Sequence, residues 1–418
     1  MNARIKKITE ALRGTIELDG SKSISNRLLI IQALCQDEFQ INRLAGADDT
    51  VILQRVLQEN TDVYDVHHAG TSYRFLTSFL CLQEGSHLLT GSDRMKERPI
   101  GPLVDALRKL GAKIEYTENE GYPPLKIDKA EWKQLDSPLE IDASISSQFI
   151  SSLLLIAPKL PNGLELKLVG DLVSRPYLEM TLELMREFGI DYSWDGDIIS
   201  ITQQEYVGKD YDVEADWSAA SYYFVLVSLV AGSKVHLQGL KKESIQGDSE
   251  IVGMMLSLGV KARWENEEWI LEHSEERTDN YEYNFILQPD LAQSIAVCVG
   301  AHGINGLFSG LQTLKVKETD RITALKNELQ KVQVYLSLLP NKFSKKSIEE
   351  MYLQAGKAVS EETPVFATYK DHRMAMSFAC LAAMMDVEIE NPMVVSKSYP
   401  KFYEDLKSLG IEVAMLKP

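Results

Sequence analysis

The chain has 418 residues, of which 44% are hydrophobic and 25% are charged, as in ordinary globular proteins. Its length predicts about two to four domains. The 61 acidic residues outnumber the 44 basic ones, and the formal net charge of −17 argues against nucleic acid as a partner, because nucleic-acid-binding surfaces are basic. Small anionic ligands are not excluded, because a locally basic cleft can concentrate them even in an acidic protein.

The cysteines and the apolar segments predict where the protein resides. Cys35, Cys81, Cys298 and Cys380 lie in or beside apolar runs without a C-x-x-C pair, so we expect buried thiols in a reducing compartment. The opening MNARIKKITE lacks the apolar core of a signal peptide. The longest apolar stretches are shorter than the ~18 residues that cross a bilayer. We therefore expect a cytoplasmic protein with no membrane partner.

An amphipathic helix followed by an alternating strand recurs along the chain. In four copies a glycine separates the two, which is the residue that best accepts the left-handed backbone after a helix. These glycines, at positions 111, 189, 259 and 410, predict a repeat of about 70–78 residues present six times, with a shorter first copy. In chain order, the predicted amphipathic helices are Val51–Glu59, Leu103–Leu110, Leu182–Phe188, Ile251–Leu258, Ile322–Lys331 and Phe402–Leu409.

Each repeat also contains a second helix that is apolar on nearly every face, which predicts that it is buried. A buried helix, a surface helix and strands around them indicate a layered α/β fold. Six repeats divide naturally into three plus three, with a boundary near Val213–Asp216. The predicted buried helices are Ser25–Cys35, Thr71–Cys81, Ser146–Pro158, Trp217–Ala231, Leu291–Gly300 and His372–Met385.

Polar residues that could bind a ligand or take part in a reaction gather at the starts of these helices. A helix N-terminus carries free N–H groups and partial positive charge, and neighbouring Lys or Arg side chains strengthen a phosphate or carboxylate site there. If several such starts converge, they form a pocket for several negative charges. Before the buried helices stand SKSISNR, AGTSYR, SISSQ, QPD and YKDHRM, and before the surface helices stand RMKERP, SRPY, QGD, KVKETDR and SKSYPK.

Each motif alone has a simpler interpretation. Ser, Thr and Asp at helix starts are usually N-caps, and a single Lys or Arg there is usually a solvated surface charge. Basic residues recur at these starts, however, although the helix dipole disfavours cations there. Such violations are expected at functional sites. The cations that run against the dipole are Lys22, Arg98, Lys317, Arg373 and Lys397.

Several motifs are missing. The chain has no phosphate-binding G-x-x-x-x-G-K-[ST] loop, no G-x-G-x-x-G dinucleotide loop and no G-x-S-x-G elbow. It has no H-E-x-x-H and no grouped Cys and His residues, which argues against zinc. We expect the pair His67 and His68 to be exposed or capping. The prediction is therefore an enzyme without metal or cofactor.

Six segments, in order, resemble the EPSP synthase (3-phosphoshikimate 1-carboxyvinyltransferase) family. They are SKSISNR, RMKERPIGPLVDALR, SISSQF, GDLVSRPY, KVKETDR and DHRMAM, and the resemblance runs from about Gly14 to Phe402. It implies two similar domains, each of three α/β units of the inside-out barrel type around buried helices, with an active-site cleft between them. In this family the N-terminal strand crosses into the C-terminal domain. We therefore assign residues 1–20 with 215–418 to one domain and 21–214 to the other.

The resemblance also implies the reaction and the residue roles. The 5-hydroxyl of shikimate 3-phosphate attacks phosphoenolpyruvate, and a tetrahedral intermediate then expels phosphate. Asp290 matches the candidate base, Glu318 the candidate acid and His372 a helper, and Lys22 is expected to touch both ligands. The residues that match the shikimate 3-phosphate site are Lys22, Ser23, Arg27, Ser146, Ser147, Ser174, Asp290 and Lys317. Those that match the phosphoenolpyruvate site are Lys22, Gly70, Arg98, Gln148, Arg321, Arg373 and Lys397.

The sequence departs from the family pattern in places. The segment between Ala47 and Gly70 is short, His68 and Thr313 stand where asparagine is usual, and Phe75 stands where proline is usual. The departures concern the pocket rather than the reaction. Two alternatives stay open: an enolpyruvyl transferase acting on a UDP-amino sugar, and an inactive relative that only binds phosphorylated metabolites. The first usually carries a reactive loop cysteine, and retention of Asp290 and Glu318 speaks against the second. We expect a monomer.

Overall fold

The structure, a computed structural model, describes residues 1–59, 61–340, 342 and 350–417. The chain divides into two compact units. The inserted unit is Gly20–Val213, and the split unit combines Met1–Asp19 with Glu214–Pro418. The chain therefore leaves the split unit after its first strands and returns to it in one long segment. Among the described residues, no helix has both the length and the apolar character needed to pass through a bilayer.

A helix forms at each of the twelve predicted places. The surface helices are α2 (Asp48–Gln58), α5 (Gly101–Lys109), α7 (Arg175–Glu187), α9 (Ile251–Leu256), α11 (Arg321–Gln330) and α13 (Phe402–Ser408). The buried helices are α1 (Lys22–Leu34), α3 (Gly70–Leu80), α6 (Ser147–Ile156), α8 (Trp217–Leu229), α10 (Ala292–His302) and α12 (His372–Ala379). The short helix α4 (Asp93–Lys96) was not predicted.

Four helices end two or more residues before their predicted ends, and two of the four, α6 and α8, end at Ile156 and Leu229 instead of Pro158 and Ala231. The predicted helix Ile251–Leu258 ends at Leu256, because Leu258 already pairs in the next strand and the positive φ of Gly259 accompanies a bulge there. The predicted helix His372–Met385 is α-helical only to Ala379 and continues as a 3-10 turn over Cys380–Ala383. The amide of Cys380 bonds the carbonyl of Ser377 at that point, which tightens the last turn.

Five four-stranded sheets within the described residues share one topology. The first two strands are parallel and the other two neighbouring pairs are antiparallel. The same holds in the split unit. In four of the sheets a buried helix connects the parallel pair, as a parallel connection requires a crossover. One sheet of the inserted unit has the strand order β4 (Val63–Asp65), β5 (Ser86–Thr90), β7 (Leu125–Asp128) and β6 (Lys113–Tyr116). Its other four-stranded sheet has the order β8 (Leu139–Asp142), β9 (Leu164–Val169), β11 (Ile198–Ile201) and β10 (Ser193–Asp195).

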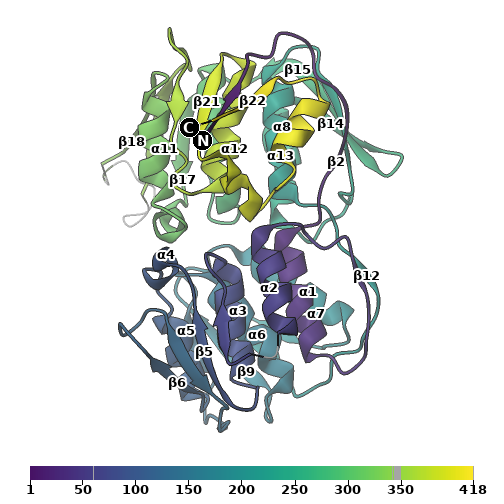
Figure 1. Ribbon diagram of the computed structural model, residues 1–418, viewed down its shortest axis with the longest axis vertical. Helices are drawn as coiled ribbons and strands as arrows, with labels where there is room; N and C mark the ends of the chain where they lie inside the picture. Colours follow the sequence, from purple (N-terminus) through teal and green to yellow (C-terminus); the bar gives the residue numbers. More distant parts are fainter. Residues whose placement is uncertain (60, 341, 343–349, 418) are drawn as a thin grey trace. The chain divides into compact units, whose positions relative to one another are not determined.

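The first residues of the chain complete two sheets of the split unit. Strand β1 (Asn2–Ile5) lies between β21 (Val387–Glu390) and β22 (Val413–Leu416), and β20 (Val365–Phe366) forms the edge. Strand β2 (Arg13–Glu17) pairs in parallel with β13 (Lys234–Gln238), followed by β15 (Glu268–Arg277) and β14 (Leu258–Glu265). The third sheet is β16 (Asn280–Asn284), β17 (Asn305–Ser309), β19 (Tyr352–Gly356) and β18 (Val334–Leu338). The chain ends therefore lie side by side, as the pairing of Asn2 with Leu416 shows (Figure 1).

The first repeat has a reduced sheet. Within the part of the chain that the structure describes, strand β3 (Ile41–Asn42) pairs with β12 (Tyr211–Asp212) alone, in parallel. Helix α2 then leads to β4 without an intervening hairpin, which accounts for the short first copy in the sequence. A strand from the end of the inserted unit thus completes its first repeat, whereas in the split unit the first strand of the chain, β1, completes the last sheet.

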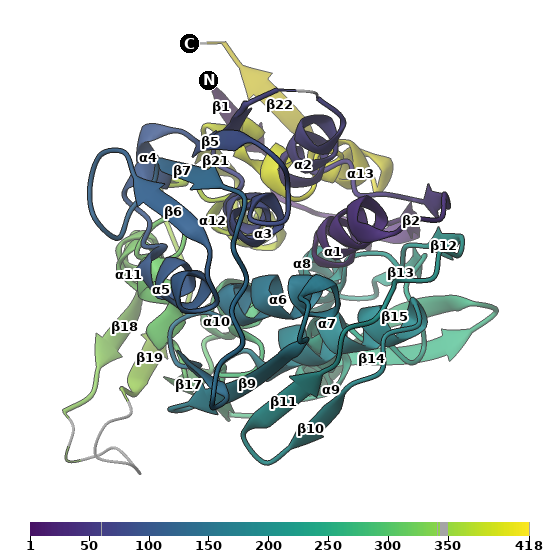
Figure 2. The same cartoon turned by 90° about the horizontal axis from the view of Figure 1, so that it is seen from below.

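Buried helices form the interior of each unit. In the inserted unit α1, α3 and α6 contact one another, and Figure 2 shows them side by side. In the split unit α10 contacts both α8 and α12, and all three helices contribute to one apolar cluster. The N-terminal residues of these helices carry the polar motifs. The repeat therefore places several helix starts within each unit.

Candidate active site

Apart from Arg27 and Arg98, the predicted residues of the inserted unit lie at the starts of four of its helices. Lys22 is the first residue of α1, whose N-cap is Ser21, and Gly70 is the first residue of α3. Ser146 caps α6 by accepting a hydrogen bond from the amide of Gln148 at 3.3 Å. Ser174 is the N-cap residue of α7. These are the positions at which unpaired backbone N–H groups face out of a helix.

Arg98 lies directly against Gly70. A Cβ atom on Gly70 would come within 2.3 Å of the Arg98 guanidinium. The Arg98 side chain is 7% exposed, and its Nε has no hydrogen-bond partner among the described residues. A buried cation needs a counter-ion. The start of α3 therefore combines a helix dipole and a guanidinium, both of which favour an anion.

Lys22 belongs to a cluster of charged side chains. Its Nζ lies 3.8 Å from Oδ2 of Asp49, whose Oδ1 lies 4.0 Å from Nε2 of His68. The same His68 nitrogen is 3.8 Å from Asp48. His68 therefore lies beside the predicted site, and it is His67, which takes a left-handed backbone, that is exposed.

Arg27 is buried and bonds within its own unit. Its guanidinium donates to Thr181 Oγ1 at 2.7 Å, to the Ser23 carbonyl at 2.8 Å and to Ser151 Oγ at 3.2 Å. Burial lowers the pKa of Arg27 to about 10, so the group is still charged at neutral pH. In this state the side chain holds the first turn of α1, which carries Ser23, against α7.

The starts of α6 and α7 have hydrogen-bond and backbone features of their own. The side-chain amide of Gln148 donates to Thr71 Oγ1 at 3.1 Å, which connects α6 to the first turn of α3. Ser147 is buried. Ser174 takes a left-handed backbone, with φ of 54°, and its side chain makes no capping bond. Strain of this kind at a non-glycine residue is typical of functional positions.

In the split unit, Arg321 connects the two predicted acid–base residues. It donates to Asp290 at 3.0 Å, to Glu318 at 2.7 Å and to Asp371 at 2.6 Å. Burial acts to lower the pKa of Arg321, but the three carboxylates, led by Asp371, raise it above the ordinary value. Arg321 begins α11 and Asp371 caps α12, and these two helices belong to the same unit (Figure 1).

Arg373 approaches Asp290 from the start of α12. Its Nη2 lies 2.9 Å from Oδ2 of Asp290, and its Nη1 donates to the Asp290 carbonyl at 3.0 Å. Asp371 caps the same helix by accepting from the amide of Arg373 at 2.8 Å. His372, which lies between Asp371 and Arg373 in the sequence, is buried. The structure therefore brings Asp290, Glu318, Arg321 and Arg373 together.

Two predicted lysines lie at the edge of this arrangement. Lys317 follows the 3-10 turn Gln312–Val316 and precedes α11. Lys397 donates to the Lys370 carbonyl at 2.8 Å. The prediction that Lys397 opens a helix is wrong, because it ends the 3-10 turn Pro392–Lys397 and α13 begins only at Phe402. At that position its charge agrees with the dipole rule instead of violating it.

Sequence reasoning missed Asp248 and Ser218. Asp248 is the last residue of the QGD motif, and Ser218 is the second residue of α8. The Ser218 hydroxyl donates to Asp248 and accepts from Arg373 at 3.3 Å. Burial, reinforced by the charge of Asp290, raises the pKa of Asp248 to about 7. The QGD motif pointed to a polar residue before a surface helix, but nothing in the sequence showed that its aspartate lies close to Ser218 and Arg373.

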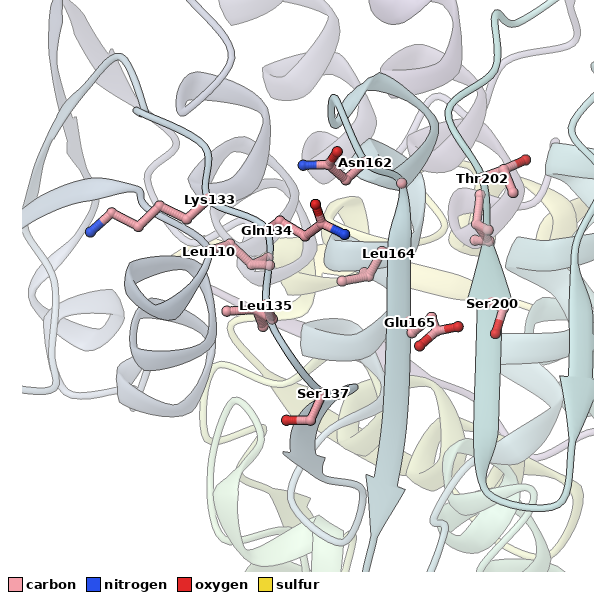
Figure 3. A pocket seen from close by; sticks show the side chains of 12 residues that line it. Leu110, Lys133, Gln134, Leu135, Ser137, Asn162, Leu164, Glu165, Ser200 and Thr202 are labelled. Carbon is pink, nitrogen blue, oxygen red and sulfur yellow. The ribbon is translucent and has the colours of Figure 1, made fainter.

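A pocket of about 300 Å³ lies elsewhere in the inserted unit. Its walls include Leu110, Gln134, Asn162, Leu164 and Thr202, and Figure 3 shows their side chains together with that of Lys133, which extends away from them. None of the predicted site residues lines this pocket. Among the residues that the structure describes, no three His, Cys, Asp or Glu side chains are grouped as a metal site requires.

Comparisons with known proteins agree on one family. The sequence model of EPSP synthase (3-phosphoshikimate 1-carboxyvinyltransferase) matches residues 52–406. A 3-phosphoshikimate 1-carboxyvinyltransferase of Bacteroides fragilis is 42% identical over 405 residues, which cover 96% of each chain. One from a Sulfurovum species is 36% identical and covers 98% of this chain and 100% of its own.

A solved structure shows the same fold. The EPSP synthase of Acinetobacter baumannii superposes with a TM-score of 0.75 at 21% identity, and the likeness covers 99% of this chain and 100% of the other. At that identity the likeness concerns the fold alone. It agrees with the prediction of an α/β fold built from repeated units.

Proposed function

Because the chain belongs to the EPSP synthase (3-phosphoshikimate 1-carboxyvinyltransferase) family, we propose that it transfers the enolpyruvyl group of phosphoenolpyruvate to the 5-hydroxyl of shikimate 3-phosphate. The products are 5-enolpyruvylshikimate 3-phosphate and inorganic phosphate. The reaction belongs to the shikimate pathway of aromatic amino-acid biosynthesis. The observation that carries the proposal is the sharing of one guanidinium, that of Arg321, by the two carboxylates that the reaction needs as acid and base.

In the proposed addition step, Asp290 takes the proton of the attacking hydroxyl. The oxygen forms a bond to C2 of phosphoenolpyruvate, and C3 receives a proton from Glu318, which gives a tetrahedral intermediate. In the second step, C3 loses a proton and the C2–O bond to phosphate breaks. One pair of groups must therefore both give and accept protons, which is general acid–base catalysis. His372 is assigned a supporting role beside them.

The ion pairs of the split unit suggest how these carboxylates become active. Arg321 is paired with the carboxyl groups of both Asp290 and Glu318. If Arg321 turns to a substrate anion, both carboxylates lose part of their counter-charge, which raises their pKa values. Asp290 then becomes a stronger base, and a larger fraction of Glu318 carries the proton that it has to donate. Following the family resemblance, we assign Arg321, Arg373 and Lys397 to phosphoenolpyruvate, together with Lys22, Gly70, Arg98 and Gln148.

Shikimate 3-phosphate is assigned to the helix starts of the inserted unit and to two residues of the split unit. Its phosphate matches hydroxyls and N–H groups that face out of helix N-termini. The assigned residues are Lys22, Ser23, Arg27, Ser146, Ser147, Ser174, Asp290 and Lys317. We further propose that the ligands draw both units together, since residues of both are assigned to each ligand. The cations and dipoles then stabilise developing charge without a covalent enzyme intermediate.

The direct test is the release of phosphate from phosphoenolpyruvate, measured with and without shikimate 3-phosphate. Release that requires shikimate 3-phosphate supports the proposal. Release that requires a UDP-amino sugar instead would assign the chain to the sugar-nucleotide reaction. Binding without any release would assign it to the inactive relatives.

The cysteines weigh against the sugar-nucleotide alternative. Cys81, Cys298 and Cys380 are buried, and burial raises the pKa of each thiol well above its ordinary value. Cys35 is half-buried, and its Sγ donates to the Tyr206 carbonyl. A nucleophilic loop cysteine would instead be accessible and readily ionised. We also propose that the enzyme is cytoplasmic and that it is a monomer.

A further inference from the structure

Helix α11 carries a buried carboxylate, Glu328, for which the proposed reaction has no role. The residue is 1% exposed. It follows Arg321 by seven residues, so the two side chains lie on the same face of the helix, and both are buried. A buried carboxylate is unfavourable unless its oxygens are bonded. The partners of Glu328 therefore indicate what its charge is used for.

Both carboxylate oxygens of Glu328 accept hydrogen bonds. Oε1 accepts from the hydroxyl of Tyr369 at 2.8 Å, and Oε2 accepts from the amide of Ala367 at 2.9 Å. Lys331 donates to the same Oε2 at 2.6 Å and to the Val365 carbonyl at 2.8 Å. Glu328 thus holds the segment between β20 and α12 against α11.

This segment contains two successive residues with a left-handed backbone. Tyr369 has φ of 54° and Lys370 has φ of 57°. Residues other than glycine seldom take this conformation, and they keep it where the surrounding contacts impose it. We call residues 367–370 the strained turn. The bonds from Glu328 to Ala367 and Tyr369 are contacts of the required kind.

The strained turn leads directly to two residues assigned to phosphoenolpyruvate. Lys397 donates to the Lys370 carbonyl at 2.8 Å. The amide of Asp371 bonds the Thr368 carbonyl at 2.8 Å, and its carboxylate accepts from the amide of Arg373 at the start of α12. A shift of the turn therefore displaces the partner of Lys397 and the cap of α12 together.

We propose that Glu328 is a positioning residue of this reaction: it fixes the strained turn, and the turn places Lys397 and Arg373 for phosphoenolpyruvate. This inference rests on the proposed function. Most residues assigned to shikimate 3-phosphate belong to the inserted unit, which does not contain the turn. Loss of Glu328 should therefore weaken phosphoenolpyruvate binding more than shikimate 3-phosphate binding.

The test compares Glu328→Leu and Glu328→Gln with the wild-type enzyme. Leucine suits a buried helical position but accepts no hydrogen bond. Glutamine keeps both contacts, because its carbonyl oxygen accepts from Ala367 and its NH2 group donates to the Tyr369 hydroxyl. In Glu328→Leu we expect KM for phosphoenolpyruvate to rise on the order of tenfold to a hundredfold, the effect of a displacement of about 1 Å in binding groups. Glu328→Gln should stay close to wild type.

A purely structural role predicts a different result. It would lower the amount of folded enzyme, and hence the apparent kcat, without raising KM for one substrate selectively. KM for shikimate 3-phosphate is therefore the internal reference. Equal rises in both KM values would contradict the inference. So would Glu328→Gln with the KM values of Glu328→Leu, because the contacts to the turn would then not be what matters.

Tyr369→Phe is a milder variant that decides the question if Glu328→Leu does not fold. It removes one hydroxyl from an exposed residue, and KM for phosphoenolpyruvate should rise selectively, to a smaller extent than in Glu328→Leu. The matched control is Tyr192→Phe, which removes a hydroxyl that donates to Glu183 at 2.9 Å in the inserted unit. Its KM values should equal those of wild type. An unchanged KM for phosphoenolpyruvate in Tyr369→Phe and in folded Glu328→Leu, with a wild-type enzyme that turns over, overturns this inference alone. A wild-type enzyme without turnover overturns the proposed function and this inference with it.

Hydrogen exchange tests the first step without turnover. The amide of Ala367 bonds Glu328, and the amide of Asp371 bonds a carbonyl within the strained turn. Both amides should exchange faster in Glu328→Leu than in wild type, because local opening becomes easier when these contacts are lost. Unchanged exchange in the folded variant would show that Glu328 does not fix the turn, which contradicts the inference.

Discussion

At the scale of single residues, the site is defined by charged side chains that are buried or nearly buried. Arg321 serves three carboxylates at once, whereas Arg98 has no carboxylate partner among the described residues. Several carboxylates therefore lie close together around two guanidinium groups in the split unit, and a buried guanidinium lies at a helix start in the inserted unit. Such arrangements are unfavourable in an empty protein and are relieved by ligands and proton transfer.

Removal of the predicted base or acid should affect turnover more than binding. Asp290→Ala and Glu318→Ala should each lower kcat by about 10²–10⁴-fold, the usual contribution of a positioned proton-transfer group. Glu318→Ala should also slow the exchange of solvent protons into the methylene group of phosphoenolpyruvate. Steady-state kinetics and calorimetry of shikimate 3-phosphate binding separate the two effects. A variant in which only KM rises would show that the residue binds substrate and does not transfer a proton.

Gly70 leaves the space that Arg98 occupies. Gly70→Ala would place a Cβ atom 2.3 Å from Nη1 of Arg98, so the guanidinium must move. We expect KM for phosphoenolpyruvate to rise by on the order of tenfold to a hundredfold, because a displacement of about 1 Å in a binding group has effects of that size. KM for shikimate 3-phosphate serves as the internal reference. If both constants rise equally, Arg98 does not belong to the phosphoenolpyruvate site.

At the scale of elements, the twelve helices were predictable because helical periodicity is local. Gly111, Gly189 and Gly410 directly follow the C-cap residues of their surface helices and have positive φ, as predicted; Gly259 also has positive φ but lies in β14. The pairing of β1 and β2 could not be predicted from local pattern, since their partners lie more than 200 residues away. Asp248 was missed for the same reason, because only the fold brings it to Ser218 and Arg373.

Two of these glycines allow the cost of the backbone to be separated from that of crowding. Gly111 has φ of +102°, and a Cβ there would lie 2.1 Å from the Glu131 carbonyl oxygen. Gly410 has φ of +85° with open space around it. Gly410→Ala should lower the free energy of unfolding by about 1 kcal/mol, and Gly111→Ala by clearly more, about 2–4 kcal/mol. Thermal or denaturant unfolding measures both, and equal losses would contradict the crowding at Gly111.

At the scale of the whole molecule, the split unit is a closed set of three repeats into which the other unit is inserted. Strand β1 completes the sheet of the last repeat, and β2 opens the sheet of the first. The insertion point falls between β2 and α8, so the chain passes between the units twice. Two chain passages are suited to a hinge.

The proposed function requires the two units to close on their ligands. Lys22, Arg98 and Ser146 belong to one unit, and Asp290 and Arg321 belong to the other. We predict that the radius of gyration from small-angle X-ray scattering decreases when shikimate 3-phosphate and phosphoenolpyruvate are added to the slowed Asp290→Ala enzyme. Only ligands that bind the closed state better can favour it. An unchanged radius at saturation, with binding confirmed by calorimetry, would show that closure does not occur.

The central claim is that phosphate leaves from a carbon atom to which shikimate 3-phosphate has been added. Phosphoenolpyruvate labelled with ¹⁸O in its bridging position tests this claim most directly. Addition followed by elimination breaks the C–O bond, so the released phosphate should carry the label, and its release should require shikimate 3-phosphate. Simple hydrolysis at phosphorus would leave the label in pyruvate. Unlabelled phosphate, or labelled phosphate released without shikimate 3-phosphate, would contradict the account.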